Sequence, residues 1–232
     1  MKSETIYGIR PVVEALRGGR RKVFEVLDAV GNAEVASASG GILVKKVQRA
    51  RIDELTRGGV HQGVAARVEP YPYSGLEEII SMPEPLIIVL DSVTDPHNLG
   101  AVLRAADGAG TSGVVIPKDR AVGVTAAAVK ASAGASEHVR VARETNLRRT
   151  IDRMKKAGIW VYAAEAGGTD YTALDLSGPL ALVLGSEGRG VRRLVREGCD
   201  GAVSIPMLGA VESLNVSVAS AVLLYEARRQ RG

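Results

Sequence analysis

The chain has 232 residues, of which 46% are hydrophobic and 24% are charged, a composition typical of folded globular proteins and unlike that of disordered, collagenous or coiled-coil chains. The single cysteine, Cys199, allows no internal disulfide and no paired-cysteine zinc site, so we expect a reducing, cytoplasmic setting. No basic segment leading into an apolar one opens the chain, and apolar runs such as residues 86–90 are far shorter than the ~20 residues that cross a bilayer. We therefore expect neither a secretory signal nor a membrane partner.

The positive charge lies in the first third of the chain. The net charge is +4, and residues 1–69 hold 12 Lys and Arg against 8 Asp and Glu, whereas residues 70–232 hold 18 of each. Basic clusters at 17–22 and 45–51 could neutralise phosphates or could simply form a solvated surface. Aromatic residues make up only 3%, which disfavours recognition of single strands by base stacking. If nucleic acid binds here, we expect contacts to its phosphates, ribose hydroxyls and shape.

The first part of the chain is predicted to be a small α/β domain that ends at residue 69. Two proline-rich segments, residues 69–75 and 82–85, enclose a short acidic stretch and indicate a linker over residues 70–84. In chain order, the patterns predict a helix at 11–16, strands at 22–27 and 41–44, a helix at 47–56 and a strand at 64–68.

From residue 85 to 232, short apolar runs alternate with helical stretches, and this second domain is predicted to hold a mainly parallel sheet with flanking helices. Runs rich in Val and Ile are typical of strands that are covered on both faces. We predict strands at 86–90, 113–116, 160–164, 180–184 and 202–205, and helices at 99–108, 146–157 and 216–229. The overall fold class is therefore α/β.

Several common active-site motifs are missing or misplaced. Residues 108–113 match G-x-G-x-x-G, but here a helix precedes the glycines and a strand follows, the reverse of a dinucleotide site, so the pattern indicates a helix end and turn. The chain has no P-loop and no G-x-S-x-G elbow, and its three histidines lack metal-ligand spacing. Nucleotidases, serine hydrolases and zinc hydrolases lose their support, and we expect no metal.

Three polar, glycine-containing segments follow predicted strands, at residues 91–104, 184–190 and 205–217. Ligands of open α/β sheets bind at the carboxyl ends of the strands, so the three segments predict one binding site at a shared edge. The first and third segments also have a simpler interpretation, because Asn98 in the first, and Ser213 or Asn215 in the third, could serve only as a helix cap.

Together these segments resemble the signature motifs of the SpoU (TrmH-like) branch of the SPOUT methyltransferases, which transfer a methyl group from S-adenosylmethionine to a ribose 2'-hydroxyl of RNA. The front of the chain, at residues 7–16 and 61–64, resembles the L30e-like RNA-binding domain often attached to this branch. The matching motif positions are Asn98, Gly100 and Arg104; Gly185, Glu187 and Gly190; Ile205 to Met207 with Ser213 to Ser217; and Glu137 in the segment Gly134 to Glu137.

The resemblance implies a deep trefoil knot in the second domain, a homodimer, and S-adenosylmethionine as the cofactor. It places cofactor binding at Gly185, Ile205 and Leu214, with Leu184, Glu187, Gly188, Met207 and Ser213 close by. The basic front domain and its resemblance place RNA binding at Arg10, Arg17, Arg20, Arg21, Lys22, His61 and Gln62.

The catalytic group implied by the resemblance is Arg104, Asn98, Glu137, Ser213 and Asn215, with Arg104 activating the 2'-hydroxyl. Since an arginine side chain with a pKa above about 12 is nearly always protonated, holding the adjacent phosphate and stabilising a developing alkoxide is physically easier, and true base action stays open. Asn98 and Asn215 would position Arg104 and the ribose, and Glu137 could orient Arg104 by an ion pair.

The expected substrate is a guanosine of 23S ribosomal RNA. A transfer RNA substrate, or a ribosome-associated RNA-binding protein without catalysis, stays open as an alternative. A dinucleotide-dependent oxidoreductase is a distant third, because the glycine context at residues 108–113 is inverted.

Overall fold

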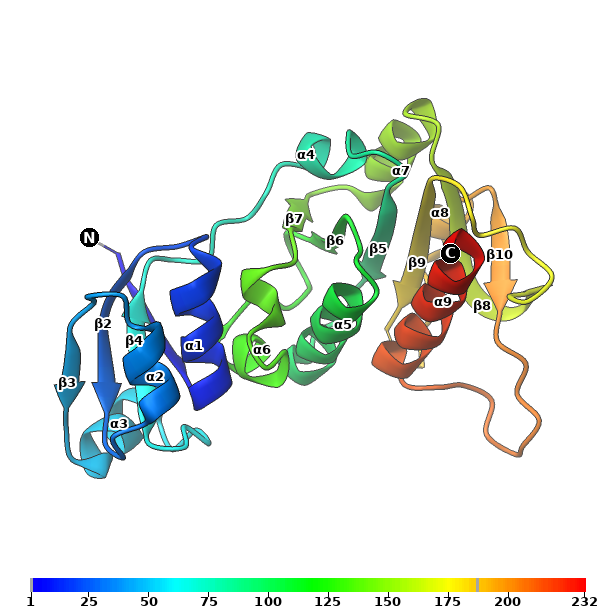
Figure 1. Cartoon of the computed structure of the whole chain (residues 1–232). Helices are drawn as coiled ribbons and strands as arrows, with labels where there is room; N and C mark the ends of the chain where they lie inside the picture. The colour runs from blue at the N-terminus through cyan, green and yellow to red at the C-terminus, as the bar shows by residue number, and fades with distance from the viewer. Residues whose placement is uncertain (1, 187) are drawn as a thin grey trace.

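A computed structural model describes residues 2–186 and 188–232; Glu187, a predicted cofactor-binding residue, lies outside the described residues. Figure 1 shows two α/β bodies in contact, the first drawn in blue to cyan and the second in green to red. The first is built on a four-stranded sheet and the second on a six-stranded sheet.

The first domain is a mostly antiparallel sheet in the order β1-β4-β2-β3. Four predicted elements are present within a few residues, but the third strand lies at 44–46 rather than 41–44, because Gly40 and Gly41 form a turn with φ of 56° and 91°. The four-residue β1 and the six-residue α2 were not predicted. The elements are β1 Glu4–Tyr7, α1 Ile9–Gly18, β2 Val23–Asp28, α2 Ala33–Ala38, β3 Val44–Lys46, α3 Arg49–Thr56 and β4 Val64–Val68.

The segment predicted as a linker packs against the second domain. It contains a short helix, α4 (Leu76–Ile80), whose Leu76 and Ile79 are buried under the large sheet. Ser74 forms a parallel bridge to Ala142, and Tyr71 is buried beside it. The chain between the two sheets is therefore held in place by apolar contacts rather than left as a free tether.

The second domain is an entirely parallel sheet in the order β10-β8-β9-β5-β6-β7, which confirms the predicted parallel architecture. All five predicted strands and three predicted helices are present, and β7, α6 and α8 are additional. The elements are β5 Leu86–Asp91, α5 Pro96–Gly108, β6 Gly113–Pro117, α6 Ala126–Ala131, the 3-10 helix η1 Ala135–Glu137, β7 Val141–Glu144, α7 Leu147–Lys156, β8 Trp160–Asp170, β9 Leu180–Gly185, α8 Arg193–Arg196, β10 Gly201–Ser204 and α9 Val216–Arg231.

Both faces of the large sheet are covered, which explains why its central strands are apolar throughout. Ile88 and Leu90 of β5 pack with residues of α5 and α9, whereas Ile87 and Val89 pack with residues of α4 and α7. Because all six strands run in one direction, their carboxyl ends share one edge. Within the described residues, no helix combines the length and the apolar character needed to cross a membrane.

Candidate functional site

The loop after β9 is pinned across the end of β5. Asp91, the last residue of β5, is fully buried and lies beside Gly185 in the paired strands. Its carboxylate accepts hydrogen bonds from the backbone N–H of Arg192 at 2.8 Å and from the Arg192 Nε at 2.7 Å. A buried carboxylate needs such partners, so Asp91 fixes where the chain at Arg192 crosses the sheet edge. Sequence reasoning missed this pair, although an acidic residue ending an apolar strand was a usable signal.

Glycines let that loop fold back on itself. A Cβ at Gly185 would overlap the backbone of Gly190, so only glycine fits at this crossing. Gly190 donates its N–H to the carbonyl of Ser186 at 2.9 Å, and Gly188 and Gly190 adopt φ of 78° and 63°. The result is a tight loop at the sheet edge that exposes backbone groups, with Leu184 buried beneath it.

An amide pair joins the first and third segments. Asn215 caps α9, accepting from the Ser217 N–H at 2.9 Å, and its Nδ2 donates to Oδ1 of Asn98 at 3.0 Å. Asn98 lies in the first turn of α5, whose cap is Asp95. The helix-cap interpretation therefore holds for Asn215, which binds Asn98 as well, and is wrong for Asn98.

Arg104 lies on the exposed face of α5. The neighbouring Leu103 is fully buried, so the helix is anchored on one side and presents Arg104 on the other. Within residues 2–186 and 188–232, Arg104 has neither a hydrogen bond nor an ion pair, so its guanidinium donors can bind a ligand. The predicted ion pair between Glu137 and Arg104 is wrong.

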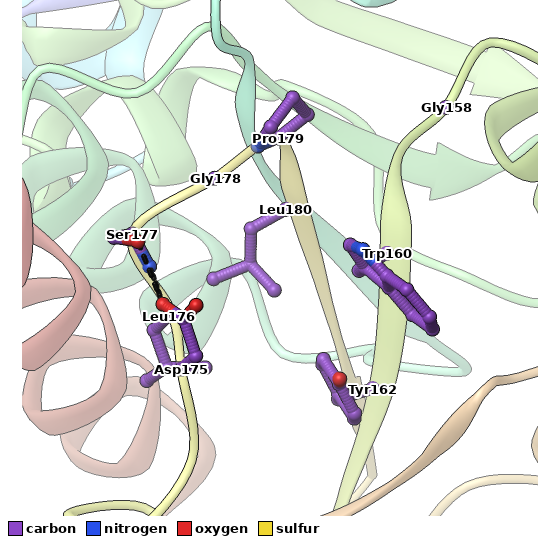
Figure 2. A pocket seen from close by; sticks show the side chains of 9 residues that line it. All are labelled: Gly158, Trp160, Tyr162, Asp175, Leu176, Ser177, Gly178, Pro179 and Leu180. Carbon is purple, nitrogen blue, oxygen red and sulfur yellow. Dashed lines mark hydrogen bonds between the residues drawn. The ribbon is translucent and has the colours of Figure 1, made fainter.

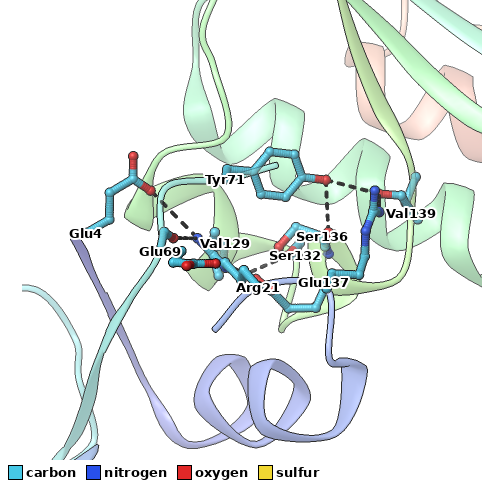
Figure 3. A network of polar contacts seen from close by, with 10 residues as sticks. Glu4, Arg21, Glu69, Tyr71, Val129, Ser132, Ser136, Glu137 and Val139 are labelled. Atoms are coloured by element: carbon cyan, nitrogen blue, oxygen red, sulfur yellow. Dashed lines mark hydrogen bonds and ion pairs between the residues drawn. The ribbon is translucent and has the colours of Figure 1, made fainter. Parts of the chain in front are cut away.

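Glu137 instead binds Arg21 of the first domain (Figure 3). Both side chains are 1% exposed; the Arg21 Nε donates to Glu137 Oε2 at 3.0 Å, and a second guanidinium nitrogen contacts Oε1. The physical reason is direction: η1, which carries Glu137, packs against α1 as well as α5, and its carboxylate enters the boundary between the domains.

The third segment leaves β10 and forms an open loop before α9, seen extending from the body in Figure 1. Ile205 packs against the core, and Leu214 is half-buried. Ser213 and Met207 are exposed, and Leu208 is 99% exposed. The predicted cofactor residues that the structure describes thus lie at the end of β9 and on the loops after β9 and β10, at the edge where Asn98 and Asn215 meet.

The prediction of RNA binding is wrong for Arg21 and His61, because both side chains are buried. Arg21 is 4% exposed and is used by Glu137. His61 is 2% exposed; its Nε2 lies 2.8 Å from Oδ1 of Asp53, and its Nδ1 accepts the N–H of Gly63. Neither side chain can reach a phosphate at the surface.

The other predicted RNA-binding residues are at least partly exposed. Arg10 and Arg17 lie beside Glu34, at 2.9 and 3.5 Å. The Arg20 guanidinium donates to the carbonyl of Val139 at 2.5 Å, whereas Lys22 is exposed near the ring of Phe24. Gln62 accepts a hydrogen bond from Lys130 at 2.6 Å. Arg20 and Gln62 therefore also contact the second domain.

A separate cavity lies at the opposite edge of the large sheet, at the amino ends of β8 and β9 (Figure 2). Its volume is about 350 Å³, and Trp160 and Tyr162 stack along one wall with their ring centroids 6.4 Å apart. Because the three glycine- and amide-rich segments follow the carboxyl ends of strands, this cavity is distinct from the candidate site. Among the described residues, no cluster of His, Cys, Asp or Glu has the arrangement of a metal site.

Two family models match the chain. Residues 85–225 match the SpoU rRNA Methylase family, and residues 5–74 match the family described as RNA 2'-O ribose methyltransferase substrate binding. The first match spans the large parallel sheet with its three loops, and the second spans the small sheet.

Curated relatives align over almost their whole length. The chain is 44% identical to a 23S rRNA (guanosine-2'-O-)-methyltransferase, RlmB, of Escherichia coli, over 99% of each chain. It is 43% identical to a Bacillus subtilis protein named as a TrmH family tRNA/rRNA methyltransferase, over 97% of this chain and 95% of that protein.

Solved structures match both domains together. The SpoU methyltransferase AviRb of Streptomyces viridochromogenes, in complex with AdoMet, aligns with a TM-score of 0.86 and 26% identity over 99% of this chain and 90% of that one. An AdoMet-bound rRNA methyltransferase of Sinorhizobium meliloti aligns with a TM-score of 0.82 and 30% identity, over 98% of this chain and 87% of that one. Scores this high over nearly the whole chain require similar relative placement of the two domains.

Proposed function

The chain belongs to the SpoU rRNA methylase family, and from that premise we propose that it transfers a methyl group from S-adenosylmethionine to the ribose 2'-hydroxyl of a guanosine in 23S ribosomal RNA. The proposal depends on one observation: hydrogen bonds connect the segments that follow β5, β9 and β10 at the carboxyl edge of the large sheet. Asn215 binds Asn98 at 3.0 Å, and Arg192 binds Asp91 at 2.7 Å, beside the helix that carries Arg104.

The residues at this edge fit the cofactor. Gly185 lets the backbone at Gly190 lie directly against the end of β9, because a Cβ at Gly185 would overlap it. Ile205 and Leu214, with Gly188, Met207 and Ser213, supply the neighbouring apolar and polar surface on the loops after β9 and β10, and Leu184 lies buried at the end of β9. When bound, S-adenosylmethionine supplies a methyl carbon that its sulfonium already activates.

The protein must then align the hydroxyl with that carbon and stabilise the charge that develops on the oxygen. Arg104 is the group for this task, because its exposed guanidinium can hold the adjacent phosphate and donate to the forming alkoxide. Asn98 and Asn215 hold the start of α5 against the start of α9, which fixes the direction from which Arg104 approaches.

The chain topology and assembly form a further part of the proposal. A deep trefoil knot in the second domain is proposed from the family to which the chain belongs. The homodimer is supported by exposed apolar side chains on the β10–α9 loop and on α9, with Leu208 at 99%, Val211 at 67%, Val218 at 47% and Tyr225 at 54% exposure. A ribosomal RNA substrate favours a location in the cytoplasm, which is part of the proposal.

The test is transfer of labelled methyl groups from S-adenosylmethionine to unmodified 23S RNA and, in parallel, to transfer RNA. We expect alkali-resistant label at one guanosine of 23S RNA. Label in transfer RNA alone would replace the substrate, and cofactor binding without transfer to either RNA or to ribosomal particles would favour the non-catalytic alternative.

The role of Arg104 is tested by Arg104→Ala. We expect at least a 100-fold loss of kcat with the Kd for S-adenosylmethionine unchanged within twofold, because the guanidinium acts on the ribose rather than on the cofactor. Arg148→Ala, which removes an exposed arginine paired with Asp152 on α7, is the matched control and should keep full activity. Equal loss of cofactor binding would make Arg104 a structural residue.

A further inference from the structure

A buried ion pair joins the two domains. Arg21 precedes β2 in the first domain, and Glu137 ends η1 in the second; the two side chains are each 1% exposed. The guanidinium meets the carboxylate with two nitrogens, the geometry in which an arginine–carboxylate pair is most directional. Two charges taken out of water in this way hold the facing surfaces in one relative position.

The polar groups around the pair also cross the domain boundary (Figure 3). The Tyr71 hydroxyl lies 3.0 Å from the carbonyl of Ser136 and 3.1 Å from that of Val139, and the Arg21 guanidinium lies 5.6 Å from the Tyr71 ring centroid. Arg21 also donates to the carbonyl of Glu69 at 3.4 Å. The two buried charges are therefore surrounded by polar and aromatic groups that contact them or their neighbours.

Tight backbone packing connects this boundary to the helix of Arg104. A Cβ at Gly134, before η1, would lie 2.7 Å from the side chain of Glu14 on α1. At the other end of the same segment, a Cβ at Gly100 of α5 would lie 2.6 Å from the carbonyl oxygen of Ala128 and 2.8 Å from the nitrogen of Ser132. The segment from α6 to η1 thus packs between α1 and α5. Its contact with α5 is at Gly100, one helical turn before Arg104.

We propose that Arg21 and Glu137 form an interdomain latch, which holds the RNA-binding domain in the one position that presents the target ribose to Arg104. Both are positioning residues, and the inference rests on the proposed RNA methyl transfer. With the latch closed, RNA bound to the first domain lies at a fixed distance from the catalytic edge. When the ion pair is broken, the first domain still binds the RNA, but the target ribose reaches Arg104 in only a fraction of the complexes.

Removing Arg21 leaves the Glu137 carboxylate buried and unpaired, a state that is relieved when the domains separate and water enters. Removing the Glu137 charge leaves Arg21 with Glu4 of its own domain at 3.7 Å, so no ion pair then joins Arg21 to the second domain. The first test therefore measures the distance between domains. Spin labels are placed at Val30→Cys and Leu194→Cys, two exposed positions, one in each domain, in a Cys199→Ser background. Burial raises the pKa of the native Cys199 thiol to about 12, so this cysteine is a poor labelling site, and the Cys199→Ser background removes any remaining reaction there.

We expect one narrow distance distribution in the labelled parent protein and a distribution at least twice as broad in Arg21→Met and in Glu137→Gln. The reversed pair, Arg21→Glu with Glu137→Arg, should narrow the distribution again, because opposite charges still meet. Arg148→Met, which removes a surface ion pair within the second domain, is the control and should leave the distribution unchanged.

The second test separates positioning from folding. For Arg21→Met we expect kcat per cofactor-binding site to fall at least tenfold, with the Kd for S-adenosylmethionine within twofold and the Kd for 23S RNA within threefold. The reversed pair should recover at least a third of kcat. A residue needed only for folding would reduce the number of cofactor sites and leave kcat per site unchanged.

An unchanged distance distribution together with unchanged kcat per site in Arg21→Met would overturn the latch. If Arg21→Met does not fold, Arg21→Lys keeps the charge but loses the paired geometry, and the same two measurements decide. Because the distance is measured without RNA or methyl transfer, a broadened distribution in an inactive protein would support the latch and reject the proposed function instead.

Discussion

Tyr71 shows how burial at the domain boundary sets the chemistry of a single side chain. Burial raises the pKa of its phenol well above the usual value near 10, and the nearby Glu137 carboxylate adds to the effect. The neutral hydroxyl donates toward the carbonyls of Ser136 and Val139. Folding therefore depends on keeping Tyr71 protonated.

We predict an alkaline loss of stability that depends on Tyr71. Its raised folded pKa means that its contribution is fully present below the unfolded pKa of about 10 and decreases as the pH rises above it. Between pH 10 and pH 11 the free energy of unfolding should fall by about 1 kcal/mol more in the parent protein than in Tyr71→Phe. Urea unfolding at pH 8, 10 and 11 measures this, and parallel pH curves for the two proteins would contradict it.

The same variant tests the hydrogen bond at neutral pH. Tyr71→Phe removes the only hydroxyl that reaches both carbonyls, so at pH 8 it should lower the free energy of unfolding by about 1 to 2 kcal/mol. Tyr171→Phe is the control, because the Tyr171 hydroxyl has no hydrogen-bond partner among the described residues, and the expected change is below about 0.5 kcal/mol.

Individual site residues could be predicted where a local motif carries the information. The resemblance to the family motifs predicts Asn98, Arg104 and Asn215 as site residues, and the structure places the two amides in contact. The pairing of Arg21 with Glu137 could not be predicted, because 116 residues separate them and each sits in a segment with its own plausible role. The sequence of a basic cluster does not show which of its side chains is buried, as Arg21 is here.

Among the elements, long periodic helices and apolar strands were predictable, whereas short ones were not. The helix α6 is a six-residue run of mostly alanine and β7 is four residues long, so neither gives a periodic signal. Their positions are set by tertiary contacts, above all the close approach of α6 to α5 at Gly100. The glycine of the first motif is thus a packing residue.

Gly100→Ala tests that contact. Alanine favours a helix over glycine by about 1 kcal/mol, but the added methyl would overlap Ala131 and press on the α6 backbone, and overpacking typically costs about 1 to 3 kcal/mol. Because the methyl meets backbone that cannot rotate away, we expect a net loss of stability near 1 kcal/mol or more, and reduced kcat from the displaced α5.

Thermal and urea unfolding measure the effect, with Gly178→Ala as the control. A Cβ at Gly178 would meet no atom within 4 Å and should leave stability unchanged within about 0.5 kcal/mol. A Gly100→Ala protein as stable as the parent would show that the two helices can separate freely.

At the scale of the whole molecule, the exposed apolar side chains between β10 and the end of α9 predict self-association. Leu208→Asp with Val211→Asp should convert a dimer to a monomer, because charges at the centre of an apolar interface are not compensated. Light scattering coupled to gel filtration measures the mass of each. Leu43→Asp, an exposed apolar position in the first domain, is the control; a parent protein that is already monomeric would reject the proposed homodimer.

The strand order of the large sheet has a consequence for how the protein is made. β9 lies between β5 and β8, which precede it in the chain, and β10 lies at an edge. During synthesis the first domain can fold early, but the centre of the large sheet stays incomplete until residue 185 has left the ribosome. With no hairpin in that sheet to form locally, folding should be slow. The edge proposed for methyl transfer is then the last part of the protein to form, so we expect an unfinished chain to bind RNA before it can modify it.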